Sequence, residues 1–388
     1  MLIAGILLLS ACTAREKPSA GEVAGTPFFT PAPKMVEARE VQLLATGAPM
    51  PAFNLPGADG RYYNSEEFAD REVLVVVFSC NHCPTAQAYE QRMMDIVRDY
   101  TSRGVTLVAI SPNSPPALLL EECGYSDLGD TFAEMQIRTR DAGYNFPYLY
   151  DGDDHAISLQ YGPVATPHAF VFDKERKLTY SGRLDASEKP GTANAEDLRQ
   201  AIDAALEGRP LDEPVTKTFG CSVKWAWKNE WTIKVNQDWA GREVTLEAVD
   251  VEGIRALLAN DSGKLRLINL WATWCGPCVI EYPEFVAIHR MYQGRDFEFV
   301  SISADKPKQQ DKALQFLKDK QSAVANYIYS GTDVYALIEA VDPDWDGALP
   351  YTVLVEPGGK RIYGKMGIID PLELKRAIVE HPMIGRYY

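Results

Sequence analysis

Residues 270–278, with the sequence Leu-Trp-Ala-Thr-Trp-Cys-Gly-Pro-Cys, constrain the fold of this chain more than any other stretch. They follow the apolar run 265–270, typical of a buried strand, and precede the helix-like run 279–292. The first turn of a helix presents unpaired N–H groups and a partial positive charge, which lower the pKa of a cysteine placed there. A second thiol three residues later can close a disulfide. We therefore predict that Cys275 and Cys278 form a redox-active pair at a turn from strand to helix.

A second Cys-x-x-Cys motif follows another buried run, earlier in the chain. Residues 72–79 include Val-Leu-Val-Val-Val-Phe, which predicts a strand covered on both faces. The sequence Cys-Asn-His-Cys-Pro at 80–84 comes next, and then a predicted helix to about residue 102 and a strand at 104–111. The plan of strand, Cys-x-x-Cys, helix and strand therefore occurs twice, which indicates a duplication on the scale of a domain.

Each motif is followed, further along the chain, by an X-Pro dipeptide at the start of a strand. Thr166-Pro167 precedes the predicted strand 169–173, and Leu349-Pro350 precedes the predicted strand 351–356. Because a proline normally blocks a central strand, its repeated place at a strand entry is a specific signal. Each half then continues with a turn, a second strand (178–182 and 361–365) and a helix (195–207 and 371–380).

These features resemble thioredoxin. The string Trp-Cys-Gly-Pro-Cys at 274–278 resembles its active site, with Trp274 as a supporting residue, and the order X-Pro, strand, turn, strand, helix resembles the C-terminal half of its fold. The resemblance implies an α/β fold class with two tandem thioredoxin-like folds, each a central mixed β-sheet flanked by helices. It also implies cis prolines, with Pro167 facing the first cysteine pair and Pro350 the second. Two ordinary trans prolines are the alternative.

Residues 51–225 resemble redoxin proteins that carry Cys-Asn-His-Cys-Pro and are often called peroxiredoxin-like. The match includes Thr-Pro-His-Ala-Phe-Val-Phe-Asp at 166–173 and Gly-Cys-Ser-Val-Lys-Trp at 220–225. Peroxiredoxins place a threonine three residues before the reactive cysteine and a proline four residues before that. Val77 and Val73 stand at those positions, so nothing obvious aligns a peroxide with the first cysteine. Disulfide exchange is therefore the expected activity of this half, and thiol peroxidase activity is the alternative.

Residues 242–377 resemble the exported thioredoxin-like reductases of the TlpA/ResA type. Glu281, three residues after Cys278, matches the acidic residue that this family places beneath its cysteine pair. Asn269 stands where thioredoxin itself has an aspartate. A buried carboxylate at Glu281 would have a raised pKa and could carry the proton of Cys278. A solvated helix residue is the alternative.

The resemblance assigns different roles to the two cysteines of each pair. Cys80 and Cys275 attack the partner, and Cys83 and Cys278 resolve the mixed disulfide. A protonated His82 and the helix terminus are both expected to favour the thiolate of Cys80. Because a stabilised reduced form makes a disulfide more oxidising, the first pair is expected to be the better oxidant. The Gly-Pro of the second motif brings no charge, so the second pair should be more reducing.

Cys123 and Cys221 stand outside both motifs. They could form a buried disulfide, remain two isolated buried thiols, or supply a resolving partner for Cys80, and these alternatives stay open. A zinc site of four thiolates is disfavoured because the two motifs lie in different halves. Residues 342–347 begin like a calcium loop, but Val353 replaces the final glutamate, so we expect an acidic loop beside the second site. We expect no metal ion and no cofactor.

The N-terminus has the features of an exported lipoprotein. An apolar run at 2–9, too short to span a bilayer as a helix, leads into Leu-Ser-Ala-Cys at 9–12, which resembles a bacterial lipobox. No Lys or Arg precedes the run, which departs from the usual signal peptide. We expect a signal at 1–12 with the lipid on Cys12, followed by a flexible tether at 13–45. An ordinary secretory signal with an incidental cysteine is the alternative.

The rest of the chain is expected to divide into a first domain at 46–215, a tryptophan-rich linker at 216–241 and a second domain at 242–388. Alternation at 223–227 predicts a half-buried strand within the linker. The tryptophans there either cover hydrophobic surface or form an aromatic docking patch for a partner.

The net charge of −15 disfavours nucleic acid as a partner, because phosphate binding needs a basic surface. The expected partners are protein thiols and disulfides, together with a membrane reached through the lipid anchor. The predicted protein is an exported thiol:disulfide oxidoreductase on the periplasmic face of a bacterial membrane. Its two sites either relay electrons to each other or serve separate substrates. The alternatives are a thiol peroxidase in the first half, or a non-enzymatic metal carrier or adaptor.

Overall fold

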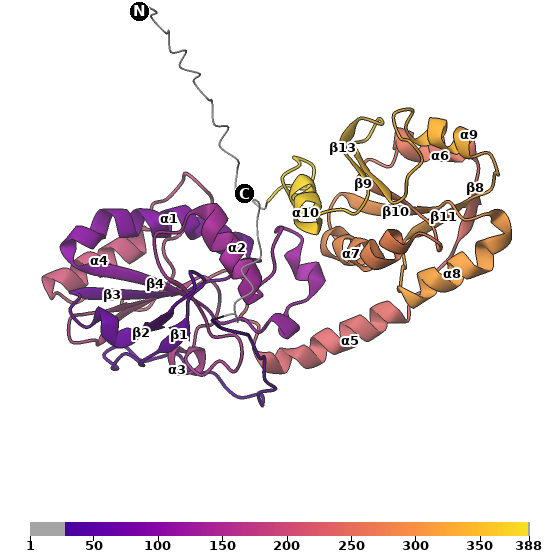
Figure 1. The fold of residues 1–388 in the computed structure, drawn as a ribbon. Coiled ribbons are helices and arrows are strands. Elements are labelled where there is room, and N and C mark those ends of the chain that lie inside the picture. Colours follow the sequence, from indigo (N-terminus) through magenta and orange to yellow (C-terminus); the bar gives the residue numbers. More distant parts are fainter. Residues whose placement is uncertain (1–27, 387–388) are drawn as a thin grey trace, which may run out of the picture. The chain divides into compact units, whose positions relative to one another are not determined.

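Five strands form the first sheet, in the order β5-β4-β3-β6-β7 (Figure 1). Strands β3, β4 and β5 are parallel, and β6 and β7 continue the sheet through antiparallel pairings. The elements of this half are β1 (Asn54–Pro56), β2 (Tyr62–Asn64), β3 (Val73–Phe78), α1 (Pro84–Tyr100), β4 (Val105–Ser111), α2 (Phe132–Ala142), β5 (Tyr148–Tyr150), α3 (Ser158–Tyr161), β6 (His168–Phe172), β7 (Leu178–Gly182) and α4 (Glu196–Glu207).

The first sheet is covered on both faces, which explains the unbroken apolar run of β3. Leu74, Val76 and Phe78 pack into a cluster with Phe53 and Tyr161, from the segments before β3 and after β5. The alternate residues of β3 are equally buried and face the other side, where α1 and α4 lie against the sheet. Burying a side chain of this size stabilises the fold by about 1.5–3 kcal/mol. The apolar residues on both faces of β3 therefore favour a central place in the sheet, where both faces are covered.

Six strands form the second sheet, in the order β13-β12-β9-β10-β11-β8. Five of them repeat the order and directions of the first sheet, and β8 adds one parallel edge strand. The elements are β8 (Glu247–Val249), α6 (Val251–Ala259), β9 (Leu265–Trp271), α7 (Gly276–Tyr292), β10 (Phe297–Ser303), α8 (Gln310–Asp319), β11 (Ala325–Tyr329), α9 (Val334–Val341), β12 (Tyr351–Val355), β13 (Arg361–Met366) and α10 (Pro371–Val379).

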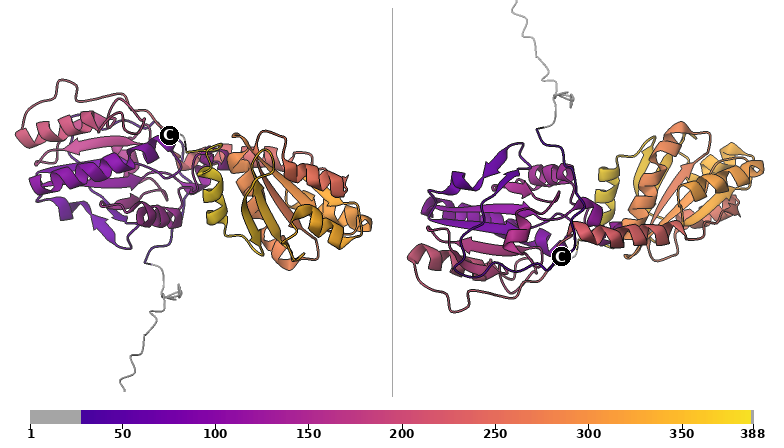
Figure 2. Two further views of the ribbon diagram at one scale, coloured as in Figure 1. Left: turned by 90° about the horizontal axis from the view of Figure 1, so that it is seen from above. Right: turned by 90° about the horizontal axis from the view of Figure 1, so that it is seen from below.

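Helices cover both faces of the second sheet as well, and Figure 2 shows this in two views. Leu265 and Leu267 of β9 pack into one cluster with residues of α7 and α10. Ile268 and Leu270 of the same strand pack into another cluster with residues of α6 and α9. Each half therefore has a thioredoxin-like fold, and the predicted fold class is confirmed.

Both X-Pro bonds predicted to be cis are cis: Thr166–Pro167 and Leu349–Pro350. The predicted strand at 223–227 is wrong. The chain there makes a short 3-10 turn, Ala226–Lys228, and continues directly into helix α5 (Asn229–Ala240). Trp225 stacks on Trp227 at 5.2 Å between ring centroids, and both rings contact a buried histidine, so the alternation reflects packing of aromatic rings.

The insertion at 113–145, which has no predicted role, contacts helix α7. Glu121 pairs with Arg290 of α7 at 2.8 Å, and the carbonyl of Ser126 accepts a hydrogen bond from the Tyr292 hydroxyl at 2.8 Å. Cys123 belongs to the hydrophobic cluster formed by α7 and α10 on the second sheet. This part of the insertion thus packs against the second half of the chain.

The computed structural model describes residues 28–386, and the chain from Pro31 onward forms one compact unit. The predicted signal, Cys12 and residues 13–27 of the predicted tether lie outside the described residues. Within those described, no helix combines the length and the apolar composition needed to cross a bilayer.

Candidate active sites

The first cysteine pair lies where β3 ends and α1 begins. Cys83 is the N-cap of α1, and Pro84 occupies its first turn. Phe78 pairs with His168 across the sheet, so the cis Thr166–Pro167 bond lies beside the motif. The Sγ of Cys80 is 3.1 Å from Thr166 Oγ1, and the Sγ of Cys83 is 3.2 Å from the Thr166 carbonyl oxygen. The structure therefore brings the pair together with the cis-proline segment.

Both cysteines of this pair are buried, with exposed fractions of 2% for Cys80 and 0% for Cys83. Burial, followed by hydrogen bonding with Cys83, raises the pKa of Cys80 well above its usual value. Burial alone would also raise the pKa of Cys83. Hydrogen bonds from the Cys221 and Cys80 thiols, and then the charge of His82, hold this pKa well below its usual value.

The predicted order of acidity within the first pair is therefore reversed. The expectation that the helix terminus favours a Cys80 thiolate assumed that the helix begins at the first cysteine. Helix α1 begins after Cys83, so the partial charge of its N-terminus acts on the second cysteine. Which of the two cysteines attacks a partner stays a prediction.

His82 forms a buried ion pair with Asp130, a residue not predicted from the sequence. His82 Nδ1 lies 2.6 Å from the Asp130 carboxylate, and both side chains are almost fully buried. Burial lowers the pKa of His82, but the charge of Asp130 overcomes this and raises it. The carboxylate also accepts the backbone N–H groups of Asn81 and His82 and an amide N–H of Asn113. Asp130 therefore holds the whole loop of the first motif.

Cys80, His82 and Asp130 also have the chemistry of a metal site. One ligand atom of each lies within 4.8 Å of the other two, and thiolate, imidazole and carboxylate are ligands of Zn²⁺. The carboxylate, however, already accepts four N–H groups from the motif and its neighbours. Among the described residues, His82 Nε2 has no hydrogen-bond partner. Because the Asp130 carboxylate is already hydrogen-bonded to the loop of the first motif, these three residues do not fit a metal site.

The second pair lies at the corresponding turn from β9 into α7. Cys275 and Cys278 are joined by a disulfide, with 5.3 Å between their Cα atoms. Cys275 is the N-cap of α7 and accepts a hydrogen bond from the Cys278 N–H at 3.3 Å. Leu349, which precedes the cis Pro350, packs against the cluster that contains both cysteines. Trp274 beside them is 63% exposed and available to a partner.

Glu281 is buried beneath this pair, with an exposed fraction of 5%. Its carboxylate accepts the N–H of Ile369 at 2.9 Å. Burial raises the pKa of Glu281 to about 7. The alternative of a solvated helix residue is therefore wrong, and Glu281 lies one helical turn from Cys278, on the same face of α7.

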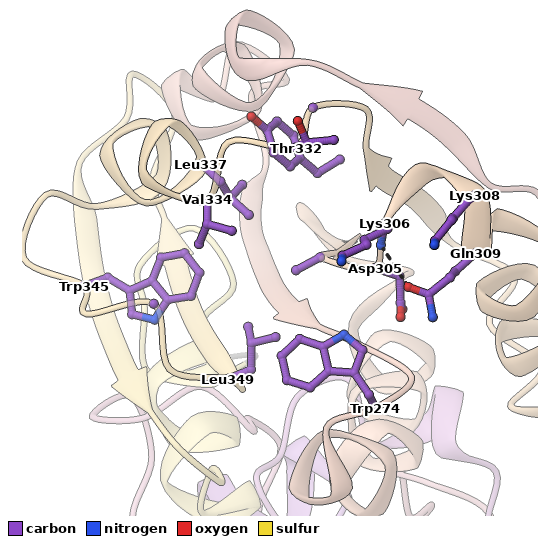
Figure 3. A pocket seen from close by; sticks show the side chains of 14 residues that line it. Trp274, Asp305, Lys306, Lys308, Gln309, Thr332, Val334, Leu337, Trp345 and Leu349 are labelled. Carbon is purple, nitrogen blue, oxygen red and sulfur yellow. Dashed lines mark hydrogen bonds between the residues drawn. The ribbon is translucent and has the colours of Figure 1, made fainter.

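A cavity of about 550 Å³ opens beside Trp274 (Figure 3). Its lining is largely apolar and includes Leu349, the residue before the cis proline. Lys306 and Lys308 stand on the side of the cavity opposite Trp345 in Figure 3. Further lining residues are Tyr329, Val334 and Leu337.

The acidic loop at 342–347 lies at this cavity, as expected. Trp345 lines the cavity and stacks on Tyr351 with 5.1 Å between ring centroids. Asp342 pairs with Arg361 and accepts the Tyr351 hydroxyl, so its carboxylate is used within the fold.

The two remaining cysteines lie in different surroundings, and both are free thiols. Cys123 is in the cluster of α7 and α10, whereas the backbone N–H of Cys221 donates to Cys83 Sγ at 3.3 Å. The alternative of a Cys123–Cys221 disulfide is therefore wrong. His168, next to Pro167, is buried and hydrogen-bonded to Ser181, as a plain strand residue would be.

Comparison with known proteins matches residues 46–181 and 238–363 to the AhpC/TSA family. The thiol-disulfide oxidoreductase ResA of Bacillus cereus is 29% identical over 111 residues, which are 29% of this chain and 60% of that protein. A candidate peroxiredoxin of Mycobacterium tuberculosis is 32% identical over 117 residues, 30% of this chain and 62% of that protein. The chain thus spans less than two thirds of these curated relatives.

Among solved structures, a hypothetical protein from Sinorhizobium meliloti 1021 is 31% identical, with a TM-score of 0.42. That match covers 48% of this chain and 97% of the other.

Proposed function

This chain belongs to the AhpC/TSA family, and from that premise we propose that it is a thiol:disulfide oxidoreductase acting on protein partners through two Cys-x-x-Cys sites. One observation carries the proposal. In each half, a Cys-x-x-Cys pair at the turn from a central strand into a helix lies next to a cis-proline segment. This arrangement gives a cysteine at a helix N-terminus, a second thiol within reach of it and a fixed backbone beside both.

At the second site, the reduced pair acts in two steps. The Cys275 thiolate attacks a sulfur of the partner disulfide, and one partner thiolate leaves. Cys278 then attacks Cys275 Sγ, which releases the second partner thiolate and leaves the Cys275–Cys278 disulfide. Glu281, with its pKa near neutrality, accepts the Cys278 proton. The exposed Trp274 and the apolar cavity beside it suit a peptide segment of the partner.

Reduction of insulin disulfides by the full chain tests this function. We expect Cys275→Ser to abolish the activity of the second site and Cys83→Ser that of the first, whereas Cys123→Ser, outside both sites, leaves the rate unchanged. Activity that persists when both Cys83 and Cys275 are replaced would contradict the proposal. Trapping of mixed disulfides with Cys278→Ala then identifies the partners.

A thiol peroxidase activity of the first half is the second candidate. It is supported by the Thr166 hydroxyl, which lies 3.1 Å from Cys80 Sγ and places a hydrogen-bonding group beside the thiol. Peroxide consumption that depends on Cys80 and survives Cys278→Ala would favour this activity. The raised pKa of Cys80 weighs against it, because the thiolate is the reactive form.

We propose further that the protein is exported and tethered to a membrane through a lipid on Cys12, with a signal at 1–12 and a tether at 13–45. Two domains at 46–215 and 242–388, joined by the linker 216–241, then carry one site each. Metabolic labelling with a radioactive fatty acid is expected to mark the wild-type chain and not Cys12→Ser. Labelling of the variant at the wild-type level would exclude the anchor.

A further inference from the structure

The first site contains a third sulfur that the Cys-x-x-Cys motif does not include. The Cys221 N–H donates to Cys83 Sγ at 3.3 Å, so residue 221 lies directly beside that sulfur. Cys221, Cys80 and Cys83 form one apolar cluster with Ala86. Cys83 thus contacts Cys221 and shares a cluster with Cys80.

Access to solvent differs among these three sulfurs. Cys80 and Cys83 are buried, whereas Cys221 is partly exposed and lies directly after the exposed Gly220. A folded partner protein therefore reaches Cys221 more easily than either cysteine of the motif.

Backbone contacts hold Cys221 in this place. The N–H of Thr166 donates to the Cys221 carbonyl at 2.9 Å, and the N–H of Cys221 lies 3.2 Å from the Thr166 carbonyl. This bridge fixes Cys221 against the cis-proline segment. Gly220 permits the approach, because its φ is +130° and a Cβ there would lie 2.1 Å from the Thr166 carbonyl oxygen.

We propose that Cys221 is a third redox-active cysteine of the first site, which exchanges disulfides with Cys83 and presents them to protein partners. The inference rests on the proposed thiol:disulfide oxidoreductase function and assigns the path by which the buried pair communicates with the surface.

The exchange conserves electrons within the site. Starting from a Cys80–Cys83 disulfide, the Cys221 thiolate attacks Cys83 Sγ. The Cys83–Cys221 bond forms as the Cys80–Cys83 bond breaks, and Cys80 leaves as a thiolate that takes up the proton released by Cys221. The Thr166 hydroxyl is placed to hydrogen-bond the departing Cys80 sulfur.

The partner is then a protein dithiol. One partner thiolate attacks Cys221 Sγ and displaces the Cys83 thiolate, which is the stabilised one. The second partner thiol attacks the mixed disulfide and frees Cys221. In sum, two partner thiols are oxidised to a disulfide, the Cys80–Cys83 disulfide is reduced to two thiols, and Cys221 returns to its starting state.

Disulfide mapping in the full chain tests the path, with Cys275→Ser and Cys278→Ser present to silence the second pair. In this background we expect Cys80→Ser, after oxidation by glutathione disulfide, to contain a Cys83–Cys221 disulfide detectable by mass spectrometry of its peptides. The matched variant Cys83→Ser should contain about tenfold less of a Cys80–Cys221 disulfide, because Cys221 contacts Cys83. Absence of the Cys83–Cys221 disulfide, while the background chain forms Cys80–Cys83, would overturn the proposal.

A second measurement leaves the buried pair unchanged. In the same background, Cys221→Ser should still form Cys80–Cys83 with glutathione but oxidise a reduced protein substrate about tenfold more slowly or worse, whereas Cys123→Ser keeps the background rate. An unchanged rate in Cys221→Ser would show that partners reach the motif directly and would overturn the path. Failure of the oxidoreductase function gives a different result: the background chain itself would neither form Cys80–Cys83 nor oxidise the substrate.

Discussion

At the scale of single residues, Glu281 couples the stability of the second half to pH. Its pKa is raised from 4.5 to about 7 by burial. Between these values the folded chain keeps a proton that the unfolded chain releases. The contribution of this carboxyl group to the free energy of unfolding is therefore complete below pH 4.5 and is lost as the pH rises through about 7.

We predict that Glu281→Gln removes this pH dependence. At pH 8 the oxidised variant should be more stable to urea than the oxidised wild type by about 1 kcal/mol, after allowance for solvent screening, and at pH 5 the two should be nearly equal. Glu284→Gln, an exposed position on the same helix, serves as the control and should leave the profile unchanged. If the free energy of unfolding varied with pH in the same way in Glu281→Gln and the wild type, the carboxyl of Glu281 would not be buried and protonated as described.

The ion pair between His82 and Asp130 should be among the costliest single contacts to break. We predict that Asp130→Asn lowers the free energy of unfolding at pH 7 by about 3 kcal/mol, because it leaves a buried imidazole and several N–H groups without their charged acceptor. The pKa of His82, followed by NMR, should fall because the charge that outweighs the effect of burial is then removed. Asp70→Asn removes an exposed ion pair with Arg71 and should cost less than about 0.5 kcal/mol. Equal effects of the two substitutions would contradict the buried pair.

The residues of the motifs were predictable because their spacing along the chain carries the signal, but their partners were not. Asp130 is 48 residues from His82, and nothing local distinguishes it from any aspartate near a helix cap. The reversed acidity of Cys80 and Cys83 depends on the residue at which α1 begins, which sequence patterns do not fix to within one turn. It also depends on the thiol of Cys221, which lies in a distant segment of the chain. Such contacts follow from the fold and not from local sequence.

At the scale of elements, the segment that carries Cys221 depends on Gly220. We predict that Gly220→Ala destabilises the chain by about 3 kcal/mol, because a Cβ would overlap the Thr166 carbonyl in addition to straining a positive φ. Gly191→Ala has a positive φ of +74° with no atom within 4 Å of the added Cβ, so it should cost about 1 kcal/mol. Urea denaturation of both variants measures the difference, and equal losses would show that the close approach is unimportant.

The bounds of strands and helices with a strong apolar pattern were predicted to within a few residues, as for β7 and β12. The predicted strand at 223–227 fails for a physical reason. Its alternating tryptophans satisfy a period of two, yet they stack on each other and on His155 in an irregular segment. The role of the insertion at 113–145 was equally unpredictable, because its contacts are with α7 and with the first motif, both distant along the chain.

At the scale of the whole molecule, two sites with different surroundings should have different reduction potentials. Hydrogen bonds to the Cys83 sulfur and the charge of His82 stabilise the reduced first pair. Glu281 beneath the second pair becomes negative above neutral pH and disfavours a thiolate there. We predict that the first pair has the higher potential, by about 30 mV or more. Equilibration with defined glutathione ratios, in full chains with one pair replaced by serine, measures both, and equal values would contradict the difference.

The burial of Cys80 and Cys83 has one more consequence, which concerns time. Small oxidants and alkylating reagents collide first with the sulfur nearest the solvent, so the enclosed pair keeps its oxidation state while the surroundings fluctuate. A change in the ambient redox balance then reaches this pair at the rate at which Cys221 exchanges disulfides with Cys83. The oxidation state of the first site would therefore lag behind its surroundings by the time that this exchange takes.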